Sequence, residues 1–243
     1  MIRLGVTGTD TGVGKTTVSR ALLGLMRADG LRVAAMKPVE TGVAADDPAS
    51  DARALASAAG TAAPMRDVCP IVLGEPLAPW MAARRAGRAI SMDVLDGAQR
   101  RLSTDADAVL VEGAGGVLVP ITERDTYVTL FRRWALDAIV VAANRLGAIN
   151  HTLLTVYALR DAAVPVLGVV LNEIDGAPPD VARATNLESL QALLPDTPVV
   201  SFPWLPAPAD HASLARTAAA SRLRELIARA RLGHSVDEGR VNR

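Results

Sequence analysis

The sequence predicts an α/β fold, a mostly parallel sheet with helices on both faces, folded as a single domain. Three observations support this prediction. Runs rich in β-formers alternate with segments that repeat apolar residues at helical spacing along the chain. The run 138–143 is almost entirely apolar, which is typical of a parallel strand covered on both faces. The first strand passes through a glycine-rich loop directly into a helix. Such alternation implies crossover connections that lay helices over a parallel sheet.

The elements of the first half follow from short local signals. Residues 2–7 are a β-rich run and predict the first strand. Residues 16–28 carry apolar side chains at helical spacing, and Gly30 ends this helix. The next apolar run, 31–36, predicts the second strand. Helical spacing then predicts three helices, at 51–59, 77–86 and 92–102.

Strands and helices continue to alternate in the second half. Residues 108–111 predict a strand that ends at Glu112. The other predicted elements, in order, are the strand 138–143, the helix 150–162, the strand 166–171, the helix 182–194, the strand 198–202 and the helix 212–230. The Pro-rich loops between them are too short to be domain linkers. We therefore expect one domain over residues 1–232, followed by a polar C-terminal tail at 233–243.

The composition excludes several classes of function. The 243 residues include 26 Lys+Arg and 26 Asp+Glu, and this zero net charge argues against a nucleic-acid or anionic-membrane partner. Aromatic residues, at 3%, are too few for a stacking platform. No apolar run approaches the roughly 18 residues of a membrane-spanning helix, and the N-terminus lacks a secretory signal. We expect a soluble cytoplasmic protein in which the single cysteine, Cys69, is a buried, inert thiol.

Polar and glycine-rich residues follow most of the predicted strands at the point where each strand ends. Because ligands of such folds bind at the carboxyl ends of the strands, we expect these loops to form one site. The strand ends concerned are Thr7, Met36, Val111, Ala143 and Leu171.

The loop 8–16 has the features of a phosphate-binding loop. Its backbone N–H groups and the following helix N-terminus can hold phosphate oxygens. Lys15 would reach the β- and γ-phosphates, and the Thr16 hydroxyl would bind Mg²⁺. Five residues separate Gly8 from Gly14, one more than in the strict pattern, but the turn and its donors are retained. The loop predicts a nucleotide site in a P-loop NTPase-like fold.

Lysine is rare in this chain. Of the 26 basic residues only Lys15 and Lys37 are lysines, and both lie beside glycine or proline near strand ends. A functional need for the compact ammonium, which a planar guanidinium cannot replace, explains this placement.

Two acidic residues are candidates for the metal site. Glu112 resembles the acidic residue of a Walker-B strand and could face the β- and γ-phosphates, because Mg²⁺ prefers carboxylates and water. Asp51 begins the helix 51–59, and spacing alone favours a helix N-cap over a metal ligand there.

Taken together, these residues resemble the dethiobiotin synthetase family of ATP-dependent carboxylases. The likeness runs in order from about residue 2 to 228 and is carried by the segments 8–16, 37–42, 50–52, 75–79, 111–116, 146–151, 172–173 and 203–205. The resemblance implies condensation of 7,8-diaminononanoate with CO₂ or bicarbonate, with ATP as co-substrate and Mg²⁺ as cofactor. The reaction passes through a carbamate and a carbamic-phosphoric anhydride to dethiobiotin, ADP and phosphate.

The resemblance also implies residue roles. Lys15, Lys37 and Thr11 are the expected catalytic residues. The expected Mg²⁺ ligands are Thr16, Asp51 and Glu112. The expected nucleotide-binding residues are Gly12, Val13, Gly14, Lys15, Thr16, Thr17, Asp51, Glu112, Gly113, Ala114, Gly115, Asn172, Glu173, Pro203, Trp204 and Leu205. The expected substrate-binding residues are Thr41, Gly116, Gly147 and Asn150.

A homodimer is implied as well, in which the helix start at 147–150 of one subunit receives the substrate carboxylate bound to the other. Two positions depart from the family pattern. Trp80 stands where histidine is frequent, and Arg145 stands where lysine is common. Core packing remains an alternative to adenine contact for Trp204.

Three other functions fit part of the sequence. A partition or septum-positioning ATPase places a lysine five residues before the loop lysine, where this chain has Asp10. A glutamine-dependent amidotransferase of cobyrinate synthesis needs a further domain with a nucleophilic cysteine, for which this chain has no room. A non-catalytic nucleotide-binding module leaves Lys37 and Thr41 without a role.

Overall fold

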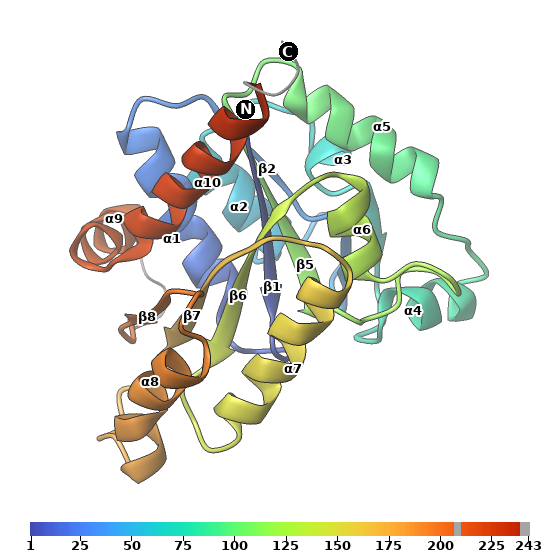
Figure 1. The fold of residues 1–243 in the computed structure, drawn as a ribbon. Helices are drawn as coiled ribbons and strands as arrows, with labels where there is room; N and C mark the ends of the chain where they lie inside the picture. Colours follow the sequence, from blue (N-terminus) through green and yellow to red (C-terminus); the bar gives the residue numbers. More distant parts are fainter. Residues whose placement is uncertain (207–209, 239–243) are drawn as a thin grey trace.

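One six-stranded parallel sheet organises residues 1–206 and 210–238, the part of the chain that the computed structural model describes (Figure 1). The strand order is β2-β5-β1-β6-β7-β8, and every pairing is parallel. The strands are β1 (Ile2–Gly8), β2 (Val33–Met36), β5 (Ala108–Gly116), β6 (Asp137–Ala143), β7 (Val166–Asn172) and β8 (Val199–Phe202). The predicted α/β class is confirmed.

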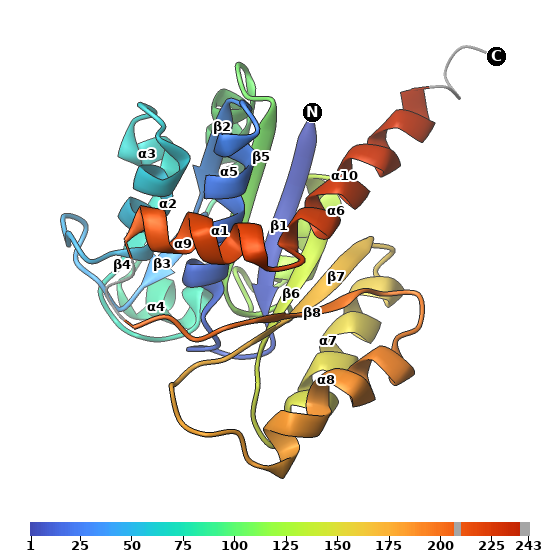
Figure 2. The ribbon, with the colours of Figure 1, turned by 90° about the vertical axis from the view of Figure 1, so that its left-hand side faces the viewer.

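Helices cover both faces of this sheet, and each face has its own apolar core. Figures 1 and 2 show α1, α9 and α10 on one side and α5, α6 and α7 on the other. Along β5 the side chains alternate, so that Leu110 joins the first core while Val109 and Val111 join the second. The helices of the first side are α1 (Lys15–Ala28), α2 (Asp51–Ala59), α9 (His211–Ala220) and α10 (Leu223–Glu238). Those of the second are α5 (Met92–Ser103), α6 (Tyr127–Arg133), α7 (Ala148–Asp161) and α8 (Val181–Leu193).

A smaller unit lies beside the carboxyl end of β2. It consists of a two-stranded parallel sheet, β3 (Val39–Thr41) with β4 (Ile71–Leu73), and the short helices α3 (Met65–Val68) and α4 (Pro79–Arg85). The sequence did not predict β3, β4 or α3, because three or four residues are too short to show a period. Pairing with β4 holds the segment that leaves β2 in a defined position next to the main sheet.

Most of the predicted elements are present with small changes at their ends. The strand expected at 31–36 begins at Val33, and the strand expected to end at Glu112 continues to Gly116. Glu112 therefore lies inside β5, opposite Val6 of β1. The sequence analysis also did not predict α6, a seven-residue helix at whose start Thr126 N donates to the Thr129 hydroxyl at 2.9 Å.

The helix expected at 212–230 is two helices. Ser221 is extended at the end of α9, and its hydroxyl donates to Ala218 O, while no glycine or proline marks the break. Helix α10 then continues to Glu238, through the first part of the expected tail, and residues 239–243 lie outside the described residues. Cys69 is buried, as predicted. In the described residues, no helix has both the length and the hydropathy required to cross a membrane.

Candidate functional site

The phosphate loop connects β1 to α1 at the carboxyl edge of the sheet. Gly14 has a φ of 86°, and its backbone lies against Asn172, whose side-chain amide donates to Val13 O at 2.9 Å. A Cβ built on Gly14 would lie 2.1 Å from Asn172 Nδ2, so only glycine fits this contact. No side chain caps the N-terminus of α1. Its first-turn N–H groups therefore remain available for an anion.

Lys15 lies over this loop with its ammonium turned back toward the chain. Its Nζ donates to Asp10 O at 3.1 Å. Burial, and next the nearby positive charge of Lys37, lower the pKa of Lys15. An anion at the helix N-terminus would relieve both effects, which is the property expected of a phosphate-binding lysine.

Lys37 is the centre of a buried cluster of charges. Its Nζ lies 2.6 Å from Glu112 Oε1 and 2.9 Å from Asp51 Oδ2. Burial alone would lower the pKa of Lys37, but the charges of Glu112 and Asp51 outweigh burial and raise it. Only 3% of Lys37 is exposed, so it is not an ordinary surface lysine.

Glu112 joins this cluster to the phosphate loop. Its Oε1 also accepts a hydrogen bond from Thr16 Oγ1 at 2.9 Å, while the buried Oε2 has no partner among the described residues. The three expected metal ligands therefore lie close together beside the Lys37 ammonium group: Thr16, Asp51 and Glu112. The register explains this, because Met36 of β2 pairs with Val111 of β5, and the next residues are Lys37 and Glu112.

The expected N-cap role of Asp51 is wrong. The N-cap of α2 is Ser50, whose hydroxyl accepts from Arg53 N at 3.3 Å. Asp51 is the first helical residue, and its carboxylate faces Lys37. Although burial acts to raise the pKa of Asp51, the adjacent Lys37 lowers it below its usual value.

These residues surround a cavity of about 400 Å³. The predicted site residues that line it are Thr11, Gly12, Gly14, Lys15, Thr16, Thr17, Lys37, Thr41, Asp51, Ala114 and Gly115. Glu112 lies directly behind Lys37, with none of its surface exposed. Gly113 packs against the Tyr127 ring, and Gly116 pairs with Gly8 in the sheet. These two glycines therefore allow close packing beside the site and do not line the cavity.

The predicted adenine-binding residues lie at the ends of β7 and β8. Asn172 is buried, whereas Trp204 is 44% exposed and lies against the backbone of Gly176. Core packing therefore does not account for Trp204. Pro203 and Leu205 flank it after β8.

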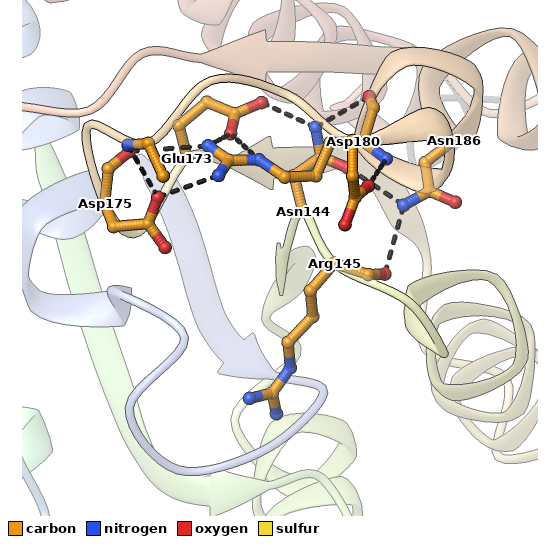
Figure 3. A network of polar contacts seen from close by, with 8 residues as sticks. Asn144, Arg145, Glu173, Asp175, Asp180 and Asn186 are labelled. Atoms are coloured by element: carbon orange, nitrogen blue, oxygen red, sulfur yellow. Dashed lines mark hydrogen bonds and ion pairs between the residues drawn. The ribbon is translucent and has the colours of Figure 1, made fainter.

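A polar network behind this region joins three elements of the second face (Figure 3). One carboxylate oxygen of Glu173 accepts from Asn144 Nδ2, and the other accepts from Arg183 Nε at 3.0 Å. Arg183 also bonds Asp175. Both oxygens of Glu173 are thus engaged in holding α8 to the ends of β6 and β7. Sequence analysis did not identify Asn144 or Arg183, because their partners are distant along the chain.

The segment 145–150 lies apart from the cavity. Gly147 begins α7 with a φ of 91°, and no side chain caps this helix. The Asn186 side-chain amide donates to Arg145 O (Figure 3). The Arg145 guanidinium approaches Asp10 Oδ2 at 3.4 Å. Neither Gly147 nor Asn150 lines the cavity of its own chain.

Glu40 is a site residue that the sequence reasoning missed. It lines the cavity and is only 4% exposed, and its carboxylate is bonded to the start of α2. Its place between Lys37 and Thr41, in the segment 37–42 that carries the family resemblance, could have pointed to it. A side chain that accepts from backbone N–H groups cannot, however, be recognised from sequence.

The chain is similar to known proteins along most of its length. The model of a family described as an AAA domain matches residues 3–211. The ATP-dependent dethiobiotin synthetase BioD of Anaeromyxobacter dehalogenans (strain 2CP-C) is 44% identical over 203 residues, 84% of this chain and 90% of the relative. The protein of that name from Nitrosospira multiformis is 44% identical over 70% of this chain and 75% of its own. That from Aquifex aeolicus is 37% identical over 79% and 84%.

Proposed function

The chain belongs to the ATP-dependent dethiobiotin synthetase family, and from this premise we propose that it joins 7,8-diaminononanoate to CO₂ at the expense of ATP. The products are dethiobiotin, ADP and phosphate, and the enzyme is a ligase of biotin biosynthesis. The observation that carries the assignment is Lys37, buried between two carboxylates on the wall of the phosphate-loop cavity.

The chemistry requires this arrangement of cations. One amine of the substrate adds to CO₂, forming a C–N bond and releasing a proton, which leaves a carbamate. A carbamate oxygen then bonds to the γ-phosphorus as ADP leaves. The second amine attacks the carbonyl carbon of the anhydride, phosphate departs, the amine loses a proton and the ureido ring closes. Because a carbamate must approach a phosphate that is already negative, positioning and fixed positive charge contribute most of the catalysis.

The residues of the cavity divide this work. Lys15 would bind the phosphates, and Lys37 would neutralise charge on the carbamate and the γ-phosphate; both residues line the cavity. Thr11 and Thr41, which both line the cavity, would hold the substrate. Asn172, Pro203, Trp204 and Leu205 are proposed to receive the adenine.

The donor set fits Mg²⁺. Thr16, Asp51 and Glu112 offer hard oxygen ligands, and Glu112 Oε2 is buried without a partner. No group of three or more His, Cys, Asp or Glu in the described residues is placed to hold a metal, so the ion would need nucleotide oxygens as well. Mg²⁺ is usually bound in this way, by one or two carboxylates with substrate phosphates. When bound, it would neutralise charge on the β- and γ-phosphates.

We also propose a homodimer in the cytoplasm, where ATP is available. The uncapped start of α7 suits a carboxylate, and the exposed apolar residues Leu146, Leu154 and Tyr157 lie before and along this helix. Gly147 and Asn150 would then serve the substrate site of the neighbouring subunit.

One experiment tests the proposed function. The protein is incubated with 7,8-diaminononanoate, ¹³C-bicarbonate, ATP and Mg²⁺, and dethiobiotin is sought by mass spectrometry. We expect dethiobiotin labelled at the ureido carbon, formed together with ADP, and almost none from Lys37→Ala. A protein that binds ATP but forms no labelled dethiobiotin would refute the assignment.

A further inference from the structure

The first turn of α2 is held by two side chains from outside the helix. Its first two N–H groups donate to the Glu40 carboxylate, Asp51 N to Oε1 at 2.6 Å and Ala52 N to Oε2 at 3.2 Å. The third, Arg53 N, donates to the Ser50 hydroxyl. These are donors that a helix start leaves without internal partners.

Glu40 reaches this helix from a rigid strand. It lies in β3 opposite Val72 of β4, and the same segment carries Lys37 and Thr41. Further bonds, Lys37 N to Val68 O and Gly42 N to Leu73 O, fix both ends of the segment. One carboxylate therefore ties the segment that bears Lys37 to the helix that begins with Asp51.

The position of the Asp51 side chain depends on where α2 begins. Asp51 is the first residue of a nine-residue helix, and its carboxylate reaches Lys37 Nζ at 2.9 Å. A small displacement of the first turn would move this carboxylate away from Thr16 and Glu112. Replacing a group that orients a metal ligand typically lowers metal affinity by about 10–100-fold.

We propose that Glu40 is a positioning residue for the metal site: its two backbone hydrogen bonds hold Asp51 where it can bind Mg²⁺. This inference rests on the proposed function, which assigns Asp51 to the metal. Glu40 acts through the backbone and not on the substrate, because both of its oxygens accept from the helix and only 4% of the residue is exposed.

The test measures the affinity for ADP by titration calorimetry, with saturating Mg²⁺ and again with EDTA. The ratio of the two affinities is the Mg²⁺ contribution. Glu40→Gln keeps the size of the side chain but has a single acceptor oxygen, so one N–H would face an NH₂ group. Glu40→Asp keeps the charge beside Lys37 and shortens the reach to the amides. Ser50→Ala is the matched control, because it removes a cap of the same helix and leaves the acceptor of Asp51 N in place.

We expect Glu40→Gln to reduce the Mg²⁺ contribution by about 10–100-fold and to leave the affinity in EDTA unchanged. Glu40→Asp should show a similar loss, and Ser50→Ala should retain the contribution. Glu40→Asp also serves if Glu40→Gln does not fold, since it keeps the negative charge.

Each of the following results would overturn the inference alone: wild-type Mg²⁺ dependence in both Glu40 variants, an equal loss in Ser50→Ala, or a loss of ADP affinity that is the same with EDTA. The inference would also be overturned if Glu40→Asp retained the Mg²⁺ contribution to ADP affinity while Glu40→Gln lost it. That result would show that the charge of residue 40 matters and not its hydrogen bonds to the helix. If the wild-type protein itself binds ADP equally with and without Mg²⁺, the metal assignment of the proposed function fails and this inference fails with it.

Discussion

Replacing Lys37 with methionine should destabilise the protein and abolish most of its activity. Methionine keeps much of the apolar part of the lysine side chain but removes the cation between Glu112 and Asp51. The Glu112 side chain has no exposed surface, so its charge would lose its nearest counter-charge in the interior. Breaking such a buried pair costs about 3–5 kcal/mol. Asp51 is 44% exposed at its side chain and water can screen it, so we expect the lower end, about 3 kcal/mol.

The loss is measured by denaturant unfolding, and for a chain of this size it corresponds to a fall in Tm of about 6–12 °C. The control is Arg85→Met, which removes a cation from an exposed ion pair with Glu75 and should cost about 0–1 kcal/mol. Mg²⁺ with ADP should raise the Tm of Lys37→Met more than that of the wild type, because the metal supplies the missing positive charge.

Activity provides the second measurement. Removing one preorganised charge of this kind typically lowers kcat by about 10²–10³, and we expect this for both Lys37→Met and Lys37→Arg. Arginine should not restore turnover, because its guanidinium is larger and planar and the pocket between two carboxylates is buried. A stability loss no greater than that of Arg85→Met, or a kcat for Lys37→Arg close to that of the wild type, would refute the reasoning.

Four further predictions follow from other contacts. Glu112→Gln should raise the Mg²⁺ concentration needed for half-maximal turnover, and EDTA should abolish turnover; an unchanged Mg²⁺ titration would remove Glu112 from the metal site. Asn150→Ala should weaken binding of 7,8-diaminononanoate in calorimetry and leave ADP binding intact, whereas full activity of a monomer in sedimentation would contradict the shared site. Ala135→Gly and Ala163→Gly, at exposed positions with φ of 49° and 57°, should each stabilise the protein by about 1 kcal/mol in denaturant unfolding; a lower midpoint would show that strain is not released there. Burial raises the pKa of the Cys69 thiol to about 12, so at pH 8 the thiolate is nearly absent and iodoacetamide should label it only after unfolding; fast labelling of the native protein would contradict this.

The parallel sheet and the phosphate loop could be predicted from the sequence, because both depend on patterns within short segments. The alternation of strands and helices predicted the parallel sheet, because periodicity reports which faces of each element are buried. The phosphate loop was recognised for the same reason. Its turn, its helix N-terminus and the places of Lys15 and Thr16 all depend on residues within one short segment.

Sequence analysis failed to place the ends of helices that no glycine or proline marks. Helices α9 and α10 were read as one helix because the break at Ser221 has no glycine or proline. The seven-residue α6 was missed; it is followed by Ala135 in a left-handed conformation, where glycine would have marked the end of a helix.

The assembly of the site was decided by tertiary structure. Lys37 lies 14 residues from Asp51 and 75 from Glu112, and Glu40 lies 11 from the amide that it accepts. Alternation along the chain does not specify which strands become neighbours. The strand order places β2 beside β5, and their register sets Lys37 next to Glu112. Sequence alone determined which residues can carry the chemistry. Only the tertiary structure decided the rest: the β2–β5 pairing sets Lys37 beside Glu112, and the place of α2 makes Asp51 face Lys37 instead of capping its own helix.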